Sequence, residues 1–247
     1  MKKIVFILII LLFVQCDNAA DCVKSTGPMV SKTFSGFEFD KILVHKGIAL
    51  VVKQGENTSI TVVSGENLID DIEVKTTDGL LTFKDQTSCN WTRDYGQTTV
   101  YITAPNLTKI YSKTEQNISS DGVLTYGQLH LYSLDEGDGF DGVGTGDFHL
   151  NVDNTYLSVE TNSISQFHLS GKTKQFNVRF YSGNGILKAG QLQTNNISIF
   201  HRGTNDMFVH PLHEIKGDIY NLGNVYAAFR PEIVEVNEHY RGKLIFN

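Results

Sequence analysis

Short runs of alternating apolar and polar residues follow one another from about Thr33 to the end of the chain. The clearest early runs cover residues 47–55, 59–63, 72–74, 80–83 and 98–102. Glycine, asparagine or aspartate bounds each run, which is typical of strands joined by turns. Alternation at period two places successive side chains on opposite faces of a strand, so one face can be buried. The pattern predicts an all-β fold.

The second half of the chain adds a longer period. Apolar pairs recur every 18 to 21 residues, beginning at Leu129, Phe148, Phe167, Ile186, Met207, Val225 and Leu244. A second series lies about half a period away, at Leu157, Phe176, Ile197, Ile215 and Ile233. Repeats of about 20 residues are typical of a solenoid, in which each coil buries its apolar face against the next coil.

With two strands per coil, this period predicts a right-handed parallel β-helix with coils of about 20 residues. The earlier strands would form its first coils or a small capping sheet. An antiparallel meander would also place strands nine or ten residues apart. The near-constant period over the last 120 or so residues favours the solenoid.

The N-terminus has the order of a secretory signal. Lys2 and Lys3 precede an apolar run over residues 4–14, which is too short to span a bilayer as a helix. Cys16 follows directly, as in a bacterial lipoprotein, where the cysteine is acylated and becomes the first mature residue. We therefore expect a signal peptide over 1–15 and a lipid anchor, such as palmitate, on Cys16. The alternative is an ordinary cleaved signal with an incidental cysteine.

The lipoprotein hypothesis predicts the location of the protein in the cell and the limits of its domains. The protein would sit in the cell envelope, in the outer membrane and facing the periplasm or the surface, and would touch the membrane only through its lipid. Residues 16–30 would be a tether and residues 31–247 one β-solenoid domain. With Cys16 acylated, Cys22 and Cys89 remain as an even pair in an oxidising compartment, and we expect a disulfide between them.

Charge and composition exclude other classes. The chain is 40% hydrophobic, which is too much for disorder, and its formal net charge is −6. No Lys/Arg stripe is present, so a nucleic-acid partner is not expected. The eight histidines are scattered and no Cys/His spacing suggests zinc. No cofactor is predicted.

An acidic, glycine-rich stretch over residues 135–147 is the one weak candidate for a metal site. Asp138, Asp141 and Asp147 lie in it, and part of it matches one unit of a calcium-binding β-roll repeat. A single unit supplies too few ligands, which favours a glycine turn whose aspartates cap local backbone groups. A catalytic carboxylate pair is a third reading.

Several motifs together resemble one family. They are the strand from Gly47 to Gln54-Gly55, the segment 104–110, and glycine-rich turns at 144–147, 182–185 and 202–206. Over residues 30–230 the chain resembles the putative auto-transporter adhesin, head GIN domain family, found mainly on lipoproteins and secreted proteins of Bacteroides-type bacteria. The resemblance implies a right-handed β-helical body with no assigned catalytic activity.

Two functional hypotheses follow. In the first, a non-catalytic envelope protein adheres to an unknown surface ligand, a glycan or a protein, through the irregular segment 85–97 with Trp91, Arg93 and Tyr95. In the second, the chain is a carbohydrate-active β-helix enzyme, a polysaccharide lyase or hydrolase. Glycoside hydrolysis needs two carboxylates across a cleft, and no acid recurs beside a basic residue at the coil spacing. No hydrolase triad or phosphate loop is present either. The sequence therefore predicts no catalytic residue and no enzyme.

Overall fold

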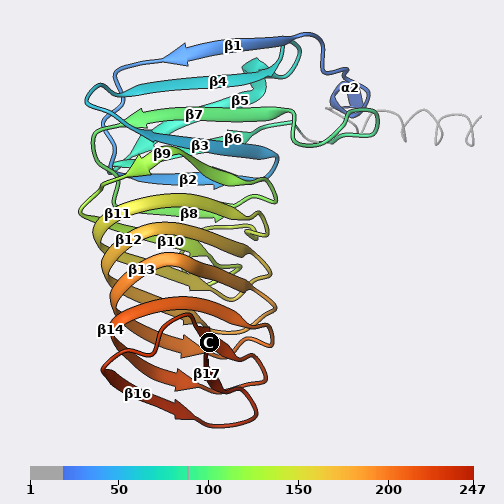
Figure 1. Cartoon of the computed structure of the whole chain (residues 1–247). Helices are drawn as coiled ribbons and strands as arrows, with labels where there is room; N and C mark the ends of the chain where they lie inside the picture. Colours follow the sequence, from blue (N-terminus) through green and yellow to red (C-terminus); the bar gives the residue numbers. More distant parts are fainter. Residues whose placement is uncertain (1–18, 88) are drawn as a thin grey trace, which may run out of the picture.

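The strands of the computed structural model form one strongly curled sheet (Figure 1). The structure describes residues 19–87 and 89–247, so Cys16 and the predicted signal 1–15 lie outside the described residues. Helix in this part is limited to α2 (Ala19–Cys22) and the 3-10 turn η1 (Ile69–Asp71). Neither is long and apolar enough to cross a membrane. The fold is all-β, as the alternation predicts.

The first half of the chain supplies short strands. They are β1 (Met29–Phe34), β2 (Lys41–His45), β3 (Ile48–Gln54), β4 (Ser59–Gly65), β5 (Ile72–Thr77), β6 (Leu80–Asp85), β7 (Thr98–Ala104), β8 (Lys109–Lys113), β9 (Ile118–Leu124) and β10 (Gln128–Ser133). The second half begins with four long strands and ends with three short ones. They are β11 (Phe148–Thr161), β12 (Gln166–Phe180), β13 (Ile186–His201), β14 (Met207–Ile219), β15 (Val225–Ala227), β16 (Ile233–Glu238) and β17 (Leu244–Phe246).

The four long strands stack in parallel as curved ribbons (Figure 1). Phe148, Phe167 and Leu187 form one inward column near the strand starts, and Leu157 and Phe176 begin a second column near their ends. From β11 to β14 both apolar series therefore run along the same continuous strands, whereas after β14 they lie on the separate short strands β15, β16 and β17. The strands bend instead of breaking, and in β12 Gly171 has φ +99°, a conformation that favours glycine.

The register corrects three members of the predicted series. Leu187, not Ile186, lies in the first column, opposite Phe167 and Met207. Val234, not Ile233, lies opposite Ile215. In both cases two adjacent apolar residues compete for one position, and alternation alone cannot choose between them.

The third correction concerns Leu129, which pairs with Leu157 and so belongs to the second column. The segment 134–147 separates β10 from β11, and β10 therefore aligns with the second half of β11. A count of residues cannot distinguish such a loop from half a repeat.

The N-terminal half mixes both strand directions. β2 and β3 pair in parallel with strands later in the chain, β6, β8, β7 and β9. β1 with β4, β4 with β7, and β5 with β6 are antiparallel. The last pair is joined by Asp78 and Gly79, which have φ of +50° and +74°. Positive φ at both residues of a two-residue turn suits an antiparallel hairpin, so this part departs from a uniformly parallel coil.

The core fills the inside of the curl. Phe148 and Phe167 are fully buried, with their rings stacked at a centroid distance of 4.8 Å. The outward face of the same strands carries polar side chains together with aromatic rings such as those of Tyr156 and Phe200.

Candidate ligand-binding surface

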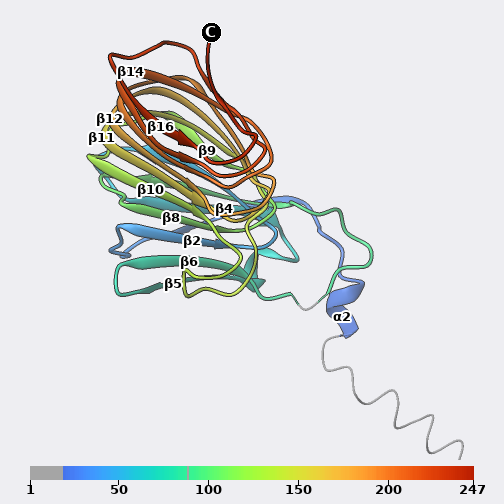
Figure 2. The same ribbon diagram turned by 90° about the horizontal axis from the view of Figure 1, so that it is seen from below.

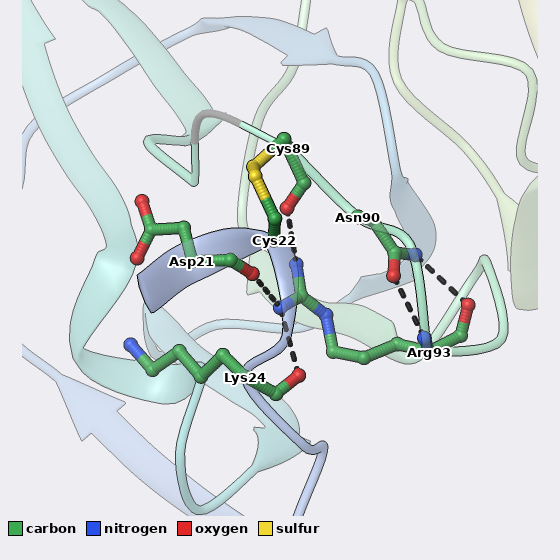
Figure 3. The surroundings of a disulfide bond; sticks show 6 residues. All are labelled: Asp21, Cys22, Lys24, Cys89, Asn90 and Arg93. Carbon is green, nitrogen blue, oxygen red and sulfur yellow. Dashed lines mark hydrogen bonds between the residues drawn. A yellow bond between two sulfur atoms is a disulfide. The ribbon is translucent and has the colours of Figure 1, made fainter. Parts of the chain in front are cut away.

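A disulfide joins Cys22, at the end of α2, to Cys89, in the irregular segment between β6 and β7 (Figure 3). The two Cα atoms are 4.7 Å apart, although the residues are separated by 67 positions. In Figures 1 and 2 α2 lies outside the stack of strands, beside this segment. The bridge thus fastens the N-terminal residues to the β6–β7 loop.

Arg93 reinforces the same junction. Its guanidinium donates hydrogen bonds to the backbone carbonyls of Asp21 (2.8 Å), Lys24 (3.0 Å) and Cys89 (3.1 Å) (Figure 3). Asn90 closes a local turn: its side-chain oxygen accepts from the Arg93 N–H at 2.8 Å and its amide donates to the Arg93 carbonyl at 2.9 Å. Arg93 therefore braces the loop from within, and Trp91 and Tyr95 are left as the side chains of the predicted trio that face outward.

Trp91 and Tyr95 are the two most exposed large hydrophobic side chains among the described residues, at 79% and 75%. The Trp91 backbone N–H nevertheless donates to the Cys22 carbonyl at 2.9 Å. The loop is thus fixed through its backbone while its aromatic rings remain in solvent.

A depression of about 600 Å³ lies beside Tyr95. Its lining includes Lys46, Asp85 and Glu115. Burial by itself would raise the pKa of Glu115. Hydrogen bonds from the Gln116 side chain and from the backbone, including the Gly47 N–H at 3.2 Å, together lower it below the usual value. Glu115 is therefore an anionic acceptor on this surface at neutral pH.

The acidic segment 134–147 is held by a buried ion pair. The Lys113 ammonium lies 3.0 Å from the Asp138 carboxylate, with side chains 0% and 3% exposed, and also donates to the Leu134 carbonyl. Phe140 packs edge-on against Tyr111 at a centroid distance of 4.9 Å. The glycine-rich segment is therefore anchored on β8.

The two irregular segments flank the turn between β2 and β3. A second depression, of about 490 Å³, lies beside residues 139–143 and shares Lys46 and Asp85 with the first. Burial, with the charges of Lys84 and Lys113, lowers the pKa of His45 here, while Asp141 opposes the shift. We call the surface formed by residues 45–47, 89–97 and 139–143 the loop surface.

The three aspartates of the calcium candidate do not gather at one point. Asp138 faces Lys113, and Asp141 lines the second depression. Asp147 accepts the Gln166 N–H at 2.9 Å. Among the described residues, the one group of three possible metal ligands joins Asp147 to two histidines, His149 and His168.

Sequence reasoning treated these histidines as scattered. They are 19 residues apart, which is one repeat, and the register places them opposite each other on β11 and β12. The period that located the core would also have paired them.

Other outward aromatic rings pack on one another. Tyr111 stacks on Tyr132 at 4.8 Å, and Phe200 contacts both Tyr181 and Tyr220. Such cross-strand pairs stabilise a sheet. Trp91 and Tyr95 have no comparable ring partner among the described residues, so they are the aromatic side chains most available for contact.

A comparison with protein families identifies the family to which the chain belongs. The model of the putative auto-transporter adhesin, head GIN domain family matches residues 38–231. The chain belongs to this family. The match spans β2 to β15 and includes all three segments of the loop surface. No curated protein matches the chain.

Solved structures show where the head GIN fold recurs. A putative adhesin from Bacteroides fragilis is 18% identical, with a TM-score of 0.78 over 90% of this chain and 99% of its own. A putative adhesin from Parabacteroides distasonis is 16% identical, with a TM-score of 0.62 over 91% and 99%. A putative lipid binding protein from the same organism is 14% identical, with a TM-score of 0.62 over 90% and 98%. At these identities the likeness is one of fold.

Proposed function

We propose that this head GIN protein is a non-catalytic adhesin of the cell envelope, anchored by a lipid on Cys16, that binds a glycan through the loop surface. Its body would be a short right-handed parallel β-helix, capped by the antiparallel pairs at its N-terminal end. The observation that carries the proposal is the exposure of Trp91 and Tyr95 on a loop that a disulfide and Arg93 hold rigid.

Rigidity matters because binding costs the entropy of ordering the groups that make contact. A loop that is already fixed loses little conformational entropy on binding. Its exposed aromatic rings also offer large contact areas to a ligand. Exposed rings of this size carry a hydration cost that contact with a ligand would remove, which supports a role in binding.

The chemistry of the neighbouring depression favours a glycan. Sugar rings have apolar faces that stack on aromatic side chains, and hydroxyl groups that pair with carboxylates and amides. Tyr95 lines the depression together with Asn90, Gln97 and Glu115. This combination offers one stacking face and several polar partners.

The anchor limits where the ligand can lie. Cys16 precedes the bridged Cys22 by six residues. A fully extended chain spans at most about 3.6 Å per residue, so lipidation would keep Cys22 within roughly 22 Å of the bilayer surface. The glycan would therefore be bound close to the membrane that carries the protein.

A glycan array with the purified protein tests the ligand class. Trp91→Ala should weaken binding at least tenfold, whereas Tyr240→Ala should change it less than twofold. Tyr240 is 56% exposed, and it follows β16, at the other end of the stack (Figure 1). Equal binding by Trp91→Ala would contradict the proposal. If the wild type bound plain phosphatidylcholine vesicles and Trp91→Ala did not, the ligand would be the lipid bilayer rather than a glycan.

The anchor and the absence of turnover have separate tests. Metabolic labelling with a palmitate analogue should mark the protein and fail in Cys16→Ser; label that persists would contradict the anchor. Incubation with polysaccharides should release no products. Products that disappear in Asp141→Asn would favour the lyase or hydrolase instead.

A further inference from the structure

Two imidazole rings lie face to face on the outside of the long strands. His149 of β11 and His168 of β12 are in register, with ring centroids 4.4 Å apart and planes inclined by 19°. Their sequence neighbours Phe148 and Phe167 point inward, so alternation fixes both histidines outward. Neither imidazole donates to or accepts from another described residue, and its ring nitrogens remain available as ligands.

Asp147 joins the pair from the same strand. It precedes His149 by two residues, which is the spacing that puts two side chains on one face of a strand. Its Oδ1 accepts the Gln166 N–H at 2.9 Å, and this bond holds the carboxylate beside the histidines. One possible ligand atom from each of the three residues lies within 4.8 Å of the other two.

These distances suit a small cation. Zinc binds nitrogen and oxygen ligands at about 2.0–2.2 Å, so its tetrahedral ligands are roughly 3.3 Å apart. The in-plane lone pairs of the two stacked imidazoles run nearly parallel, so binding requires the rings to turn about χ2 as well as a movement of each ligand atom by about 1 Å. His149 is exposed and the other two residues are half-buried, so such rotations meet little resistance.

The surrounding backbone and surface leave coordination positions open. The β9–β11 ladder shifts register between His149 and Asn151, and the β12–β13 ladder shifts between His168 and Ser170. Register shifts of this kind interrupt the regular alternation and change the direction of nearby side chains, as β-bulges do beside functional sites. A depression of about 560 Å³ lies over the same residues and is also lined by Lys188.

The positive charge of Lys188 lies beside the site and would repel a bound cation. Lys188 lies opposite His168 on β13, and its ammonium donates to the Gln166 side-chain oxygen at 2.9 Å. The carboxylate of Asp147 offsets this positive charge. Two imidazoles and one carboxylate form a ligand set that first-row divalent transition metals prefer, whereas Ca²⁺ prefers oxygen ligands alone.

We propose that Asp147, His149 and His168 form a binding site for a first-row divalent transition-metal ion, with Zn²⁺ as its probe. The protein supplies three ligands, and the remaining positions face the depression, where water or a donor group of a bound molecule completes the coordination. This site is separate from the loop surface.

Calorimetric titration of the chelator-treated protein with ZnCl₂ tests the proposal. The wild-type protein should bind one ion, and saturation should raise its melting temperature, because the ligands of β11 and β12 are brought together only in the folded state. His149→Ala and His168→Ala should each weaken binding at least tenfold. Asp147→Asn should weaken it less, since its amide keeps one oxygen.

His213→Ala is the matched control, because His213 is a half-exposed histidine on β14, which β13 separates from the site. It should leave the affinity within twofold. All four variants should melt like the wild type without metal. Unchanged affinity in His168→Ala, or equal losses in His213→Ala, would overturn the site. Displacement of Zn²⁺ by equimolar Ca²⁺ would overturn the assigned class of metal.

Discussion

The ammonium of Lys113 lies 3.0 Å from the carboxylate of Asp138, and the two side chains are 0% and 3% exposed. The pair joins β8 to the glycine-rich segment 134–147, which otherwise offers few apolar side chains to the core. Asp138 Oδ1 also accepts the Phe140 N–H at 3.2 Å, whereas its Oδ2 has no hydrogen-bond partner among the described residues. The carboxylate therefore depends on Lys113 for compensation of its charge.

Removal of one partner of the Lys113–Asp138 pair should lower the free energy of unfolding more than removal of both. Lys113→Met leaves a buried carboxylate without its counter-charge, and we expect a loss of about 3–5 kcal/mol in the free energy of unfolding. Lys113→Met combined with Asp138→Leu should recover most of it, because two apolar groups of similar volume need no charge compensation. Urea denaturation of the single and double variants measures the coupling. Additive losses would show that the pair is not a unit.

The disulfide should stabilise the protein through the unfolded chain. It joins residues 67 positions apart, for which loop-closure entropy predicts a contribution of at most about 4 kcal/mol. Cys22→Ala with Cys89→Ala should lose up to this value in the free energy of unfolding, while the folded junction persists because Arg93 still holds it through three carbonyls. Denaturation with and without reductant checks this: the wild type under reductant should match the double variant.

The period-two alternation makes a sharp prediction at two adjacent residues. Phe167 is fully buried against Phe148, and Phe167→Ala should cost about 3–5 kcal/mol. His168 faces outward, and His168→Ala should stay within about 0.5 kcal/mol in metal-free buffer. Similar losses at both positions in urea denaturation would contradict the assigned facing.

His201 should make stability depend on pH. It is fully buried and accepts the Gly203 N–H at 3.3 Å, and burial lowers its pKa to about 4. Its unfolded value is about 6.5. Below pH 6.5 the unfolded chain takes up a proton that the folded chain refuses, so stability falls as the pH drops towards 4. When fully lost, this effect of His201 lowers the free energy of unfolding by roughly 3 kcal/mol.

Substitution of His201 isolates this effect. His201→Asn keeps an acceptor for Gly203 and removes the titrating group. Its unfolding free energy should vary less between pH 7 and pH 4 than that of the wild type. Identical pH profiles would exclude His201 as the cause.

The sequence predicted the features that depend on local pattern. The alternation located the early strands to within a few residues, and the 19-residue steps from Phe148 to Phe167 and from Leu157 to Phe176 match the observed columns. The prediction of a parallel solenoid did not include the antiparallel β5–β6 hairpin, although Asp78-Gly79 between two alternating runs is a signal for one.

The features it missed depend on contacts between distant segments. Alternation along Lys109–Lys113 would place Lys113 on the outward face, but the segment 134–147 folds over it. Arg93 looked like a surface cation, and only the position of α2 shows that backbone carbonyls occupy its guanidinium. Deletion of the β6–β7 loop would also remove Cys89 and Arg93, which hold the junction with α2, so its effect would not isolate binding by the loop.

Attachment of protein-coated beads to a surface that carries the glycan identified on the array tests the central claim most directly. Trp91→Ala combined with Tyr95→Ala leaves Cys89 and Arg93 in place, so the loop should keep its fold and its melting temperature. We predict that attachment falls to that of uncoated beads, that Tyr240→Ala beads attach like the wild type, and that the glycan is recovered unchanged in mass. Undiminished attachment by the double variant, or a cleaved glycan, would contradict the account.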